Sequence, residues 1–468
     1  MMSASPTDRV AQPNTIEFEL KNVSPYIYSP DSASAATGWD IGTKVRIKLV
    51  SGANTRYWMF RISDITVMPG VKAERRVKVV ANDYMEELNR RKITGLTVQL
   101  NKRADELFTT LIAQMPIAPT ATSYGTGLYV HPYAFAEETD EATMCMTIAQ
   151  KIAQSGMCYV YVDGDATGGE TLVLEVPEER YRATSSATFS NDMIAMQPRR
   201  SRQDIFNSAK TTITPVSVAL TATTVGETDD EIALEPGESS EVKIRYVDAG
   251  TSKRVTAVNP ISPVAGTDYD SWDKTNGAGN NMNASLTLTG TDNGNSMTIA
   301  LTNGHATKKI YIPSIVVRGQ LATGYNKQDV KDSDATSITA YGETELSFNM
   351  PYASHVEVAK TVAAEMIRRY KDPHTQITSL KFNANRSSTF MGYALTLGIG
   401  DKVTITETVT ALSSSTYYIN GMEYELLSGS GSYTLNVTLY LERDFAAGNT
   451  YFVVGTSALG GAHILMPL

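Results

Sequence analysis

The sequence predicts a mainly β fold with a few helices, a β-rich α+β protein, and three observations support this class. Thr, Ser, Tyr, Gly and Val are abundant. Short runs of alternating apolar and polar residues recur between Gly, Asn and Asp turns, which is the pattern of antiparallel strands. Only a few segments have apolar residues at helical spacing instead. A length of 468 residues suits roughly three domains.

A repeat at the two ends of the chain predicts two similar small antiparallel β-barrels. IGTKVRI at 41–47 returns as IGDKVTI at 399–405, identical at five of seven positions, and similar alternating runs follow each copy. Short strands at this spacing are typical of small barrels. The alternative is two unrelated strand entries, since such a short pattern arises easily by chance.

The pair Gly398 and Gly400 has two interpretations. A phosphate-binding loop places backbone N–H groups at a helix N-terminus after a strand. Here an alternating run follows the glycines, so we predict a tight turn into a strand instead.

The first barrel is expected over residues 10–100, interrupted by a short helix at 82–92. A helix and β-hairpin domain should follow over 101–190. Its helices are expected at 100–115 and 140–156 from their apolar faces.

The second barrel is expected in two pieces, 191–213 and 331–445, with a long helix at 356–372. Between them, 214–330 is rich in Thr, Ser, Gly and Asn and has regularly spaced alternating strands, which predicts an inserted immunoglobulin-like β-sandwich. The last segment, 446–468, is apolar and almost uncharged. We expect this C-terminal tail to pack on a partner subunit or on the barrel.

Composition excludes several classes of protein. No run approaches the ~18 apolar residues of a membrane helix, and the first residues lack the apolar segment of a signal peptide. Cys145 and Cys158 are expected to be buried thiols of a reducing compartment. A net charge of −9 argues against nonspecific binding to duplex DNA.

No catalytic, cofactor-binding or metal-binding residue is predicted, and the binding residues are not identified. Asp163–Gly168 begins like a calcium loop, but Leu174 stands where the twelfth position needs a bidentate Glu, so we interpret it as a hairpin turn. The five histidines form no zinc pattern. Cys145 lies on the apolar stripe of its helix, where core packing is the better interpretation than a nucleophile.

Other candidates remain open as alternatives. Tyr246, Tyr269 and Trp272 could stack on sugar rings, or they could belong to the sandwich core or rim. A glycosidase would need a carboxylate pair such as Glu178 and Glu179 in a cleft, and sequence alone places no pair there. Short basic runs, such as Arg199–Arg202 and Arg368–Arg369, are interpreted as solvated faces or inter-subunit ion pairs.

The order of these features resembles the tail hub (tail-tip or baseplate hub) proteins of tailed bacteriophages. The resembling segments cover most of the chain outside the predicted sandwich. They are DIGTKVRIKLV, FRISDITVMPGVKAERRVKVVANDYMEELNRRKI, VQLNKRADELFTTLI, TIAQKIAQSGMCYVYVDGDATGGETLVLE, MPYASHVEVAKTVAAEMIRRYKDP, ANRSSTFMGYALTLGIGDKVTITETVTALSSSTYYINGMEYEL and GTSALGG.

The resemblance implies a structural virion protein, located at the phage tail tip after synthesis in the host cytoplasm, with no catalysis and no cofactor. Such hubs are homotrimers whose six barrels form a pseudo-sixfold ring, so that a threefold object matches a sixfold tube. The implied partners are other copies of the chain, the tail tube or distal tail protein ring, the tape measure protein and a central spike or fibre. Phage DNA would pass through the lumen without specific binding. The alternative is a receptor- or carbohydrate-binding tail protein that meets a host-surface glycan through 214–330.

Overall fold

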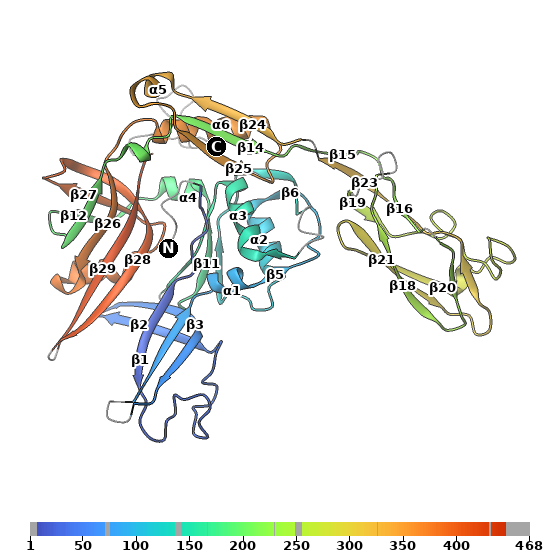
Figure 1. Ribbon diagram of the computed structural model, residues 1–468, viewed down its shortest axis with the longest axis horizontal. Coiled ribbons are helices and arrows are strands. Elements are labelled where there is room, and N and C mark those ends of the chain that lie inside the picture. Colours follow the sequence, from blue (N-terminus) through green and yellow to red (C-terminus); the bar gives the residue numbers. More distant parts are fainter. Residues whose placement is uncertain are drawn as a thin grey trace.

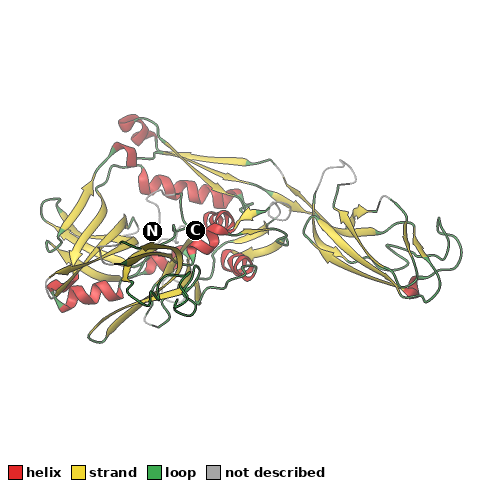
Figure 2. Cartoon of the chain, turned by 60° about the horizontal axis from the view of Figure 1, so that its bottom comes forward, coloured by secondary structure: helices red, strands yellow, loops and turns green. Residues whose placement is uncertain are grey.

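The computed structural model confirms a mainly β protein with a few helices (Figure 1). Strands form small sheets joined by short helices, and an elongated β unit stands at one end of the long axis in both views (Figures 1 and 2). The structure describes residues 7–70, 75–135, 142–165, 167–228, 230–248, 255–324, 326–429 and 432–445. The predicted tail at 446–468 lies outside these residues.

The N-terminal sheet has four antiparallel strands in the order β1-β4-β3-β2. Its strands are β1 (Thr15–Lys21), β2 (Lys44–Ser51), β3 (Asn54–Met68) and β4 (Arg76–Asn82). The segment 22–43 joins β1 to β2 and anchors Tyr28 and Trp39 against the core of the sheet, where their rings meet edge to face at 5.2 Å.

The C-terminal sheet contains the same four-strand arrangement. Its inner strands run β26-β29-β28-β27, which matches β1-β4-β3-β2 strand for strand, and all of these pairings are antiparallel. The strands are β26 (Gln376–Asn383), β27 (Lys402–Glu407), β28 (Leu412–Gly429) and β29 (Ser432–Arg443). Helix α7 (Ser388–Thr396) joins β26 to β27, in the place that 22–43 occupies in the N-terminal sheet.

Hydrogen bonds at the repeated motif show how closely the sheets correspond. The Gly42 N–H donates to the Ile62 carbonyl at 2.8 Å, and the Gly400 N–H donates to the Ile419 carbonyl at 2.8 Å. Both glycines have positive φ, +84° and +92°, which a side chain would disfavour. A β-bulge follows Ile62 in β3 and Ile419 in β28. The predicted turn into a strand is therefore confirmed at both copies.

Corresponding positions also build the two cores. Strand pairing matches apolar residues of the N-terminal sheet to apolar residues of the C-terminal sheet, and all of them pack into their respective cores. The pairs are Val45 and Val403, Ile62 and Ile419, Ile65 and Met422, Val77 and Val437, and Val79 and Leu439. Two similar sheets therefore carry the repeat that the sequence contains.

The sheets differ in how far they close. The C-terminal sheet gains β12 (Ser185–Ser190) beside β27 and β13 (Ala195–Arg199) beside β26. The connection between them bonds to both sides, because Asn191 N–H donates to Thr406 and Ile194 N–H donates to Lys381. This six-stranded sheet curls into a half-barrel.

The N-terminal sheet has no such flanking strands among the described residues, and it stays open. Two similar small β-barrels were expected, and the first is an open four-stranded sheet instead. The physical reason is that closure depends on β12 and β13, which come from a segment far from the repeat.

The helical module lies beside both sheets and has its own core (Figure 1). Its helices are α1 (Met85–Arg90), α2 (Ala104–Ala113), α3 (Cys145–Gly156) and α4 (Pro177–Arg182). Its strands are β5 (Lys92–Ile93), β6 (Gln99–Arg103), β7 (Ala121–Tyr124), β8 (Val130–Ala134), β9 (Thr143–Met144), β10 (Tyr159–Asp163) and β11 (Thr171–Glu175).

Two details of this module correct the sequence prediction. Leu100 lies in strand β6, so the helix predicted from 100 begins only at Ala104. The helix predicted from 140 begins only at Cys145, because Thr143 and Met144 form strand β9. Gly156 is the last residue of α3, and Met157 after it takes the left-handed conformation. A Cβ on Gly156 would lie 2.7 Å from the Ala104 Cβ, so this glycine serves close packing of α2 on α3. Cys145 and Cys158 are buried free thiols, as predicted.

A further layer was expected to belong to the second barrel. It is a separate three-stranded sheet, β24-β14-β25, covered by the long helix α6 (Val356–Tyr370). Its other elements are β14 (Ser208–Ile213), β24 (Gln328–Ser333), β25 (Glu345–Met350) and α5 (Ala335–Tyr341). Alternation in the sequence identifies these strands but does not say which sheet they join. We call this unit the α6 layer.

The insert is the β unit at the end of the long axis (Figures 1 and 2). Its sheets β18-β21-β20 and β15-β23-β16, with β19 beside β23, enclose one core, as expected for a sandwich. Its strands are β15 (Val216–Val218), β16 (Thr223–Glu227), β17 (Ile232–Leu234), β18 (Ser239–Arg245), β19 (Thr256–Ile261), β20 (Leu286–Asp292), β21 (Ser296–Asn303), β22 (Ile310–Ile312) and β23 (Val316–Gly324).

A two-stranded ribbon connects the insert to the α6 layer. Ile213 pairs with Gln328 at the end of the β14/β24 ladder, and Val216 pairs with Gly324 where the β15/β23 ladder begins. A small apolar cluster, which includes Tyr133 of β8 and Val258 of β19, also joins the insert to the helical module. In the described part of the chain, no helix is long and apolar enough to cross a membrane.

Candidate assembly surfaces

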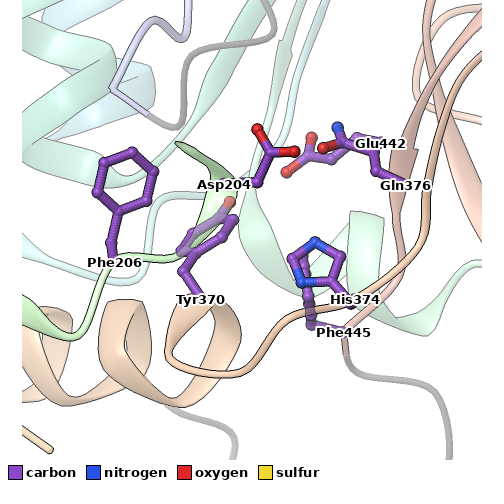
Figure 3. Close-up of a pocket in the computed structure, with 7 residues that line it drawn as sticks. All are labelled: Asp204, Phe206, Tyr370, His374, Gln376, Glu442 and Phe445. Atoms are coloured by element: carbon purple, nitrogen blue, oxygen red, sulfur yellow. The ribbon is translucent and has the colours of Figure 1, made fainter. Parts of the chain in front are cut away.

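A small cavity between the α6 layer and the C-terminal sheet is the first place to look for chemistry (Figure 3). Its volume is about 50 Å³. This is room for water and too little for a sugar ring. The lining residues are Asp204, Phe206, Tyr370, His374, Gln376, Glu442 and Phe445.

The titratable groups of this cavity are engaged in packing and pairing. Burial lowers the pKa of His374, whose ring meets the Phe445 ring edge to face at 4.8 Å. The Glu442 carboxylate accepts from Arg180 at 3.2 Å, and the Asp204 carboxylate accepts from Arg199 at 2.8 Å. We interpret the cavity as a packing gap at a junction between modules.

Arg180 holds the helical module to the C-terminal sheet. Its guanidinium is fully buried and donates to Glu175 at 2.9 Å and to Glu442 at 3.2 Å. It also lies over the rings of Tyr159 and Tyr418, at 4.1 and 4.7 Å from their centres. A buried arginine with carboxylates and aromatic faces around it fixes one relative position of two modules.

Arg56 ties the N-terminal sheet to the same junction. It donates to the Leu397 carbonyl at 2.6 Å and pairs with Asp163. Burial raises the pKa of Asp163 to about 6, and the neighbouring Arg56 opposes that shift. Three modules therefore meet at one ion pair, in which Arg56 is buried and Asp163 is partly exposed.

The loop containing Gly398 and Gly400 enters this junction. A Cβ on Gly398 would lie 2.5 Å from a carboxylate oxygen of Asp163, and one on Gly400 would lie 2.6 Å from the Tyr161 hydroxyl. Between them, Ile399 packs with Tyr161 in a small apolar cluster. The loop leads into strand β27, so the glycines permit close approach between modules and form no phosphate site.

A groove of about 380 Å³ lies where the N-terminal and C-terminal sheets meet. We call it the inner groove. Three elements line it: the turn between β2 and β3, the turn between β10 and β11, and the end of α7. The residues are Ala53, Asn54, Thr55, Arg56, Asp163, Gly164, Asp165, Leu395 and Thr396.

A second groove of about 480 Å³ lies at the corresponding turn of the C-terminal sheet. We call it the outer groove. The turn between β27 and β28 forms one wall, and the end of α6 with the residues after it forms another. The lining is Arg200, Arg368, Arg369, Asp372, Pro373, His374, Thr375, Thr410, Ala411, Leu412, Ser415, Arg443 and Phe445.

The outer groove brings together arginines that are far apart in the sequence. Arg200, Arg368, Arg369 and Arg443 line it, and Asp372 is the only acidic residue among the described residues of the lining. Arg368 and Arg369 also pair with Glu365, at 2.7 and 2.6 Å. The sequence analysis treated the basic runs separately and missed this cluster, since only the fold joins the end of α6 to the strand ends. The four arginines come from three segments, and nothing in the sequence links these segments to one another.

In the loop Asp163–Gly168, which begins like a calcium site, the Asp165 carboxylate accepts hydrogen bonds from the loop's own backbone. Asp165 accepts from the backbone N–H groups of Thr167 and Gly169 at 2.6 and 2.8 Å. The backbone N–H of Tyr57 in β3 donates to the Asp165 carbonyl at 2.7 Å, so the loop packs against the N-terminal sheet. Among the described residues, no group of three or more His, Cys, Asp or Glu could hold a metal ion.

The three aromatic residues considered for sugar stacking do not form one platform. Tyr246 is fully buried in the insert core, and its hydroxyl donates to Asp292 at 2.9 Å. Tyr269 packs partly buried against that same core, and Trp272 is also partly buried. Tyr246 therefore cannot stack on a ligand, and its burial agrees with the alternative that these residues belong to the sandwich core or rim. Glu178 and Glu179 both lie in the first turn of α4.

Comparison with known proteins gives a loose structural match. No family model and no curated protein matches this sequence. One solved structure with a similar arrangement is the 43 kDa tail protein of prophage MuSo2 from Shewanella oneidensis. The two chains share 10% identity, the match covers 92% of this chain and 89% of the other, and the TM-score is 0.41.

Proposed function

We propose that this chain is a structural component of a bacteriophage tail, a homotrimeric hub that adapts a sixfold tail tube to a threefold tip or spike. The observation that carries the proposal is the internal repeat. Two sheets on one chain share strand order, a turn hydrogen bond and a bulge position, yet they lie in different surroundings. A threefold assembly matches a sixfold one when each subunit offers two near-equivalent surfaces.

Other features support a role in assembly over one in catalysis. Two buried arginines, Arg180 and Arg56, join modules to one another. The ordered resemblance of the sequence segments to tail hubs agrees with this role. In the proposal, the tube or distal tail ring, the tape measure protein and a spike or fibre bind different faces of the trimer. Phage DNA passes through the lumen without specific binding.

The oligomeric state and symmetry of the purified chain test the proposal. Mass photometry should give a trimer, and two-dimensional class averages in end view should show six similar lobes. A stable monomer at all concentrations, or a dimer without a ring, would contradict the hub.

A second candidate function rests on the position of the insert. It stands apart from the other modules on a ribbon, which suits a unit that reaches a host receptor or glycan (Figures 1 and 2). Binding of the full chain to a glycan array, lost when the insert is excised, would support it. A blank array would remove it.

A further inference from the structure

Two isoleucines at the same position of the repeat have different surroundings. Ile399 precedes Gly400 and packs with Tyr161 of the helical module, whereas Ile41 precedes Gly42 and is 52% exposed. The backbone around them is alike, because the same hydrogen bond joins each glycine to its sheet. The single chain thus covers one copy of this position and leaves the other uncovered.

The two grooves differ in the same way. In the inner groove, α7 of the C-terminal sheet supplies a wall against the β2–β3 turn of the N-terminal sheet. The outer groove has the corresponding β27–β28 turn. Among the described residues that line it, none comes from a segment that joins the first two strands of a sheet. One wall present in the inner groove is therefore missing from the outer groove.

The repeat identifies the segment that corresponds to α7. This segment is 22–43, which joins β1 to β2 as α7 joins β26 to β27. Tyr28 and Trp39 anchor it inward. Its outer side exposes large apolar residues, namely Val23, Ile27 and Ile41, with exposed fractions of 53, 36 and 52%.

Charge favours a contact between this segment and the outer groove. Segment 22–43 carries Asp31 and Asp40, both exposed, and no Lys, Arg or His. The outer groove is lined by four arginines and Asp372, and although Arg368 and Arg369 share Glu365 as an ion-pair partner, Arg200 and Arg443 leave the lining with a positive balance. Opposite charges of this kind steer two surfaces together and select the partner.

We propose that the outer groove binds segment 22–43 of a second copy of this chain. The contact repeats between subunits the arrangement that α7 and the β2–β3 turn make within one subunit. It is a head-to-tail contact, which generates a ring when the rotation closes. Around a ring of three copies, the contact within each subunit then alternates with the contact between neighbouring subunits. The inference rests on the proposed hub and names the surfaces that join its subunits.

Site-specific photo-crosslinking tests the contact in the full chain. A benzophenone amino acid replaces Val409, which is 92% exposed in the β27–β28 turn beside the outer groove. Mass spectrometry of the crosslinked oligomer should place the adduct within 22–43 of another copy. The matched control carries the same probe at Leu220, which is 94% exposed on the insert, and should give no inter-copy adduct.

An association measurement separates this inference from the proposed function. Ile41→Arg should raise the concentration needed for half-trimerisation by about tenfold or more, since it places a charge in an apolar contact and repels the arginines of the groove. Leu220→Arg should leave that concentration unchanged. If the native chain trimerises but Ile41→Arg has no effect and the adduct lies elsewhere, this contact is wrong and the hub stands. If the native chain never trimerises, both fail.

Discussion

Asp83 is a buried carboxyl at the end of β4, just before α1. It accepts from Asn14 at 2.7 Å and from the Met85 backbone N–H at 3.0 Å. These hydrogen bonds favour the charged form, but burial outweighs them and raises the pKa of Asp83 to about 7. The folded chain therefore holds this proton more tightly than the unfolded chain does.

This difference sets a direction for stability against pH. Because the pKa of Asp83 is raised in the folded state, its contribution to the free energy of unfolding falls as pH rises from about 4 to about 7. One proton limits the slope to about 1.4 kcal/mol per pH unit. Asp83→Asn should flatten the dependence between pH 5 and pH 8, measured by urea unfolding. An unchanged slope in this variant would show that Asp83 keeps an ordinary pKa.

The burial of single residues could be predicted where apolar residues recur at helical spacing. The stripe of α6, including Val362 and Met366, is buried as its spacing predicts, and Cys145 is buried on α3. Tyr246 shows the limit of this approach. Its hydroxyl donates to Asp292, which lies on another strand. The spacing of residues in the sequence does not predict that hydrogen bond.

At the scale of elements, Gly156 sets how closely α2 and α3 pack. Gly156→Ala would place a methyl group 2.7 Å from the Ala104 Cβ and push the helices apart. We expect a loss of about 1–3 kcal/mol in the free energy of unfolding, measured by chemical denaturation. Gly304→Ala is the matched control, because its nearest neighbour would lie at 3.4 Å, and it should change stability by less than about 0.5 kcal/mol. Equal losses in both variants would contradict the packing role.

The repeat motif predicted that the two sheets are similar, but it did not predict how many strands each sheet contains. Gly42 and Gly400 mark equivalent turns, and the strands after them align as the alternation suggests. The closure of one sheet could not be predicted, since β12 and β13 come from a segment with no counterpart in the first copy. The strands of the α6 layer were assigned to the second barrel for a related reason. They pair with strands far away in the sequence, and such pairing leaves no local sequence pattern.

At the scale of the whole molecule, the candidate surfaces arise only when modules meet. The outer groove needs Arg200, Arg368 and Arg443 in one place, and these residues come from three separate segments. The sequence contains the repeat, and the repeat suggested that subunits associate. The proposed contact between the outer groove and segment 22–43 could not be located from the sequence, because it was inferred by comparing the two grooves of the folded chain.

Excision of the insert tests how independent the modules are. Joining Ile213 to Gln328 through a short glycine turn should preserve the trimer in mass photometry, because the two residues are already paired neighbours. The Tyr133 cluster would lose its partners Val258 and Ala322, so a modest fall in thermal midpoint is expected. Loss of the trimer would show that the insert takes part in subunit contact.

The ribbon that bears the insert has a consequence for how such a protein can change over generations. Its two strands bring the entry and exit points of the insert together before the sandwich begins. A different sequence can therefore be substituted between these points without altering the closure of any other loop. Recombination at this one position would give such a protein a new domain in a single event, while the modules that carry the insert are inherited intact.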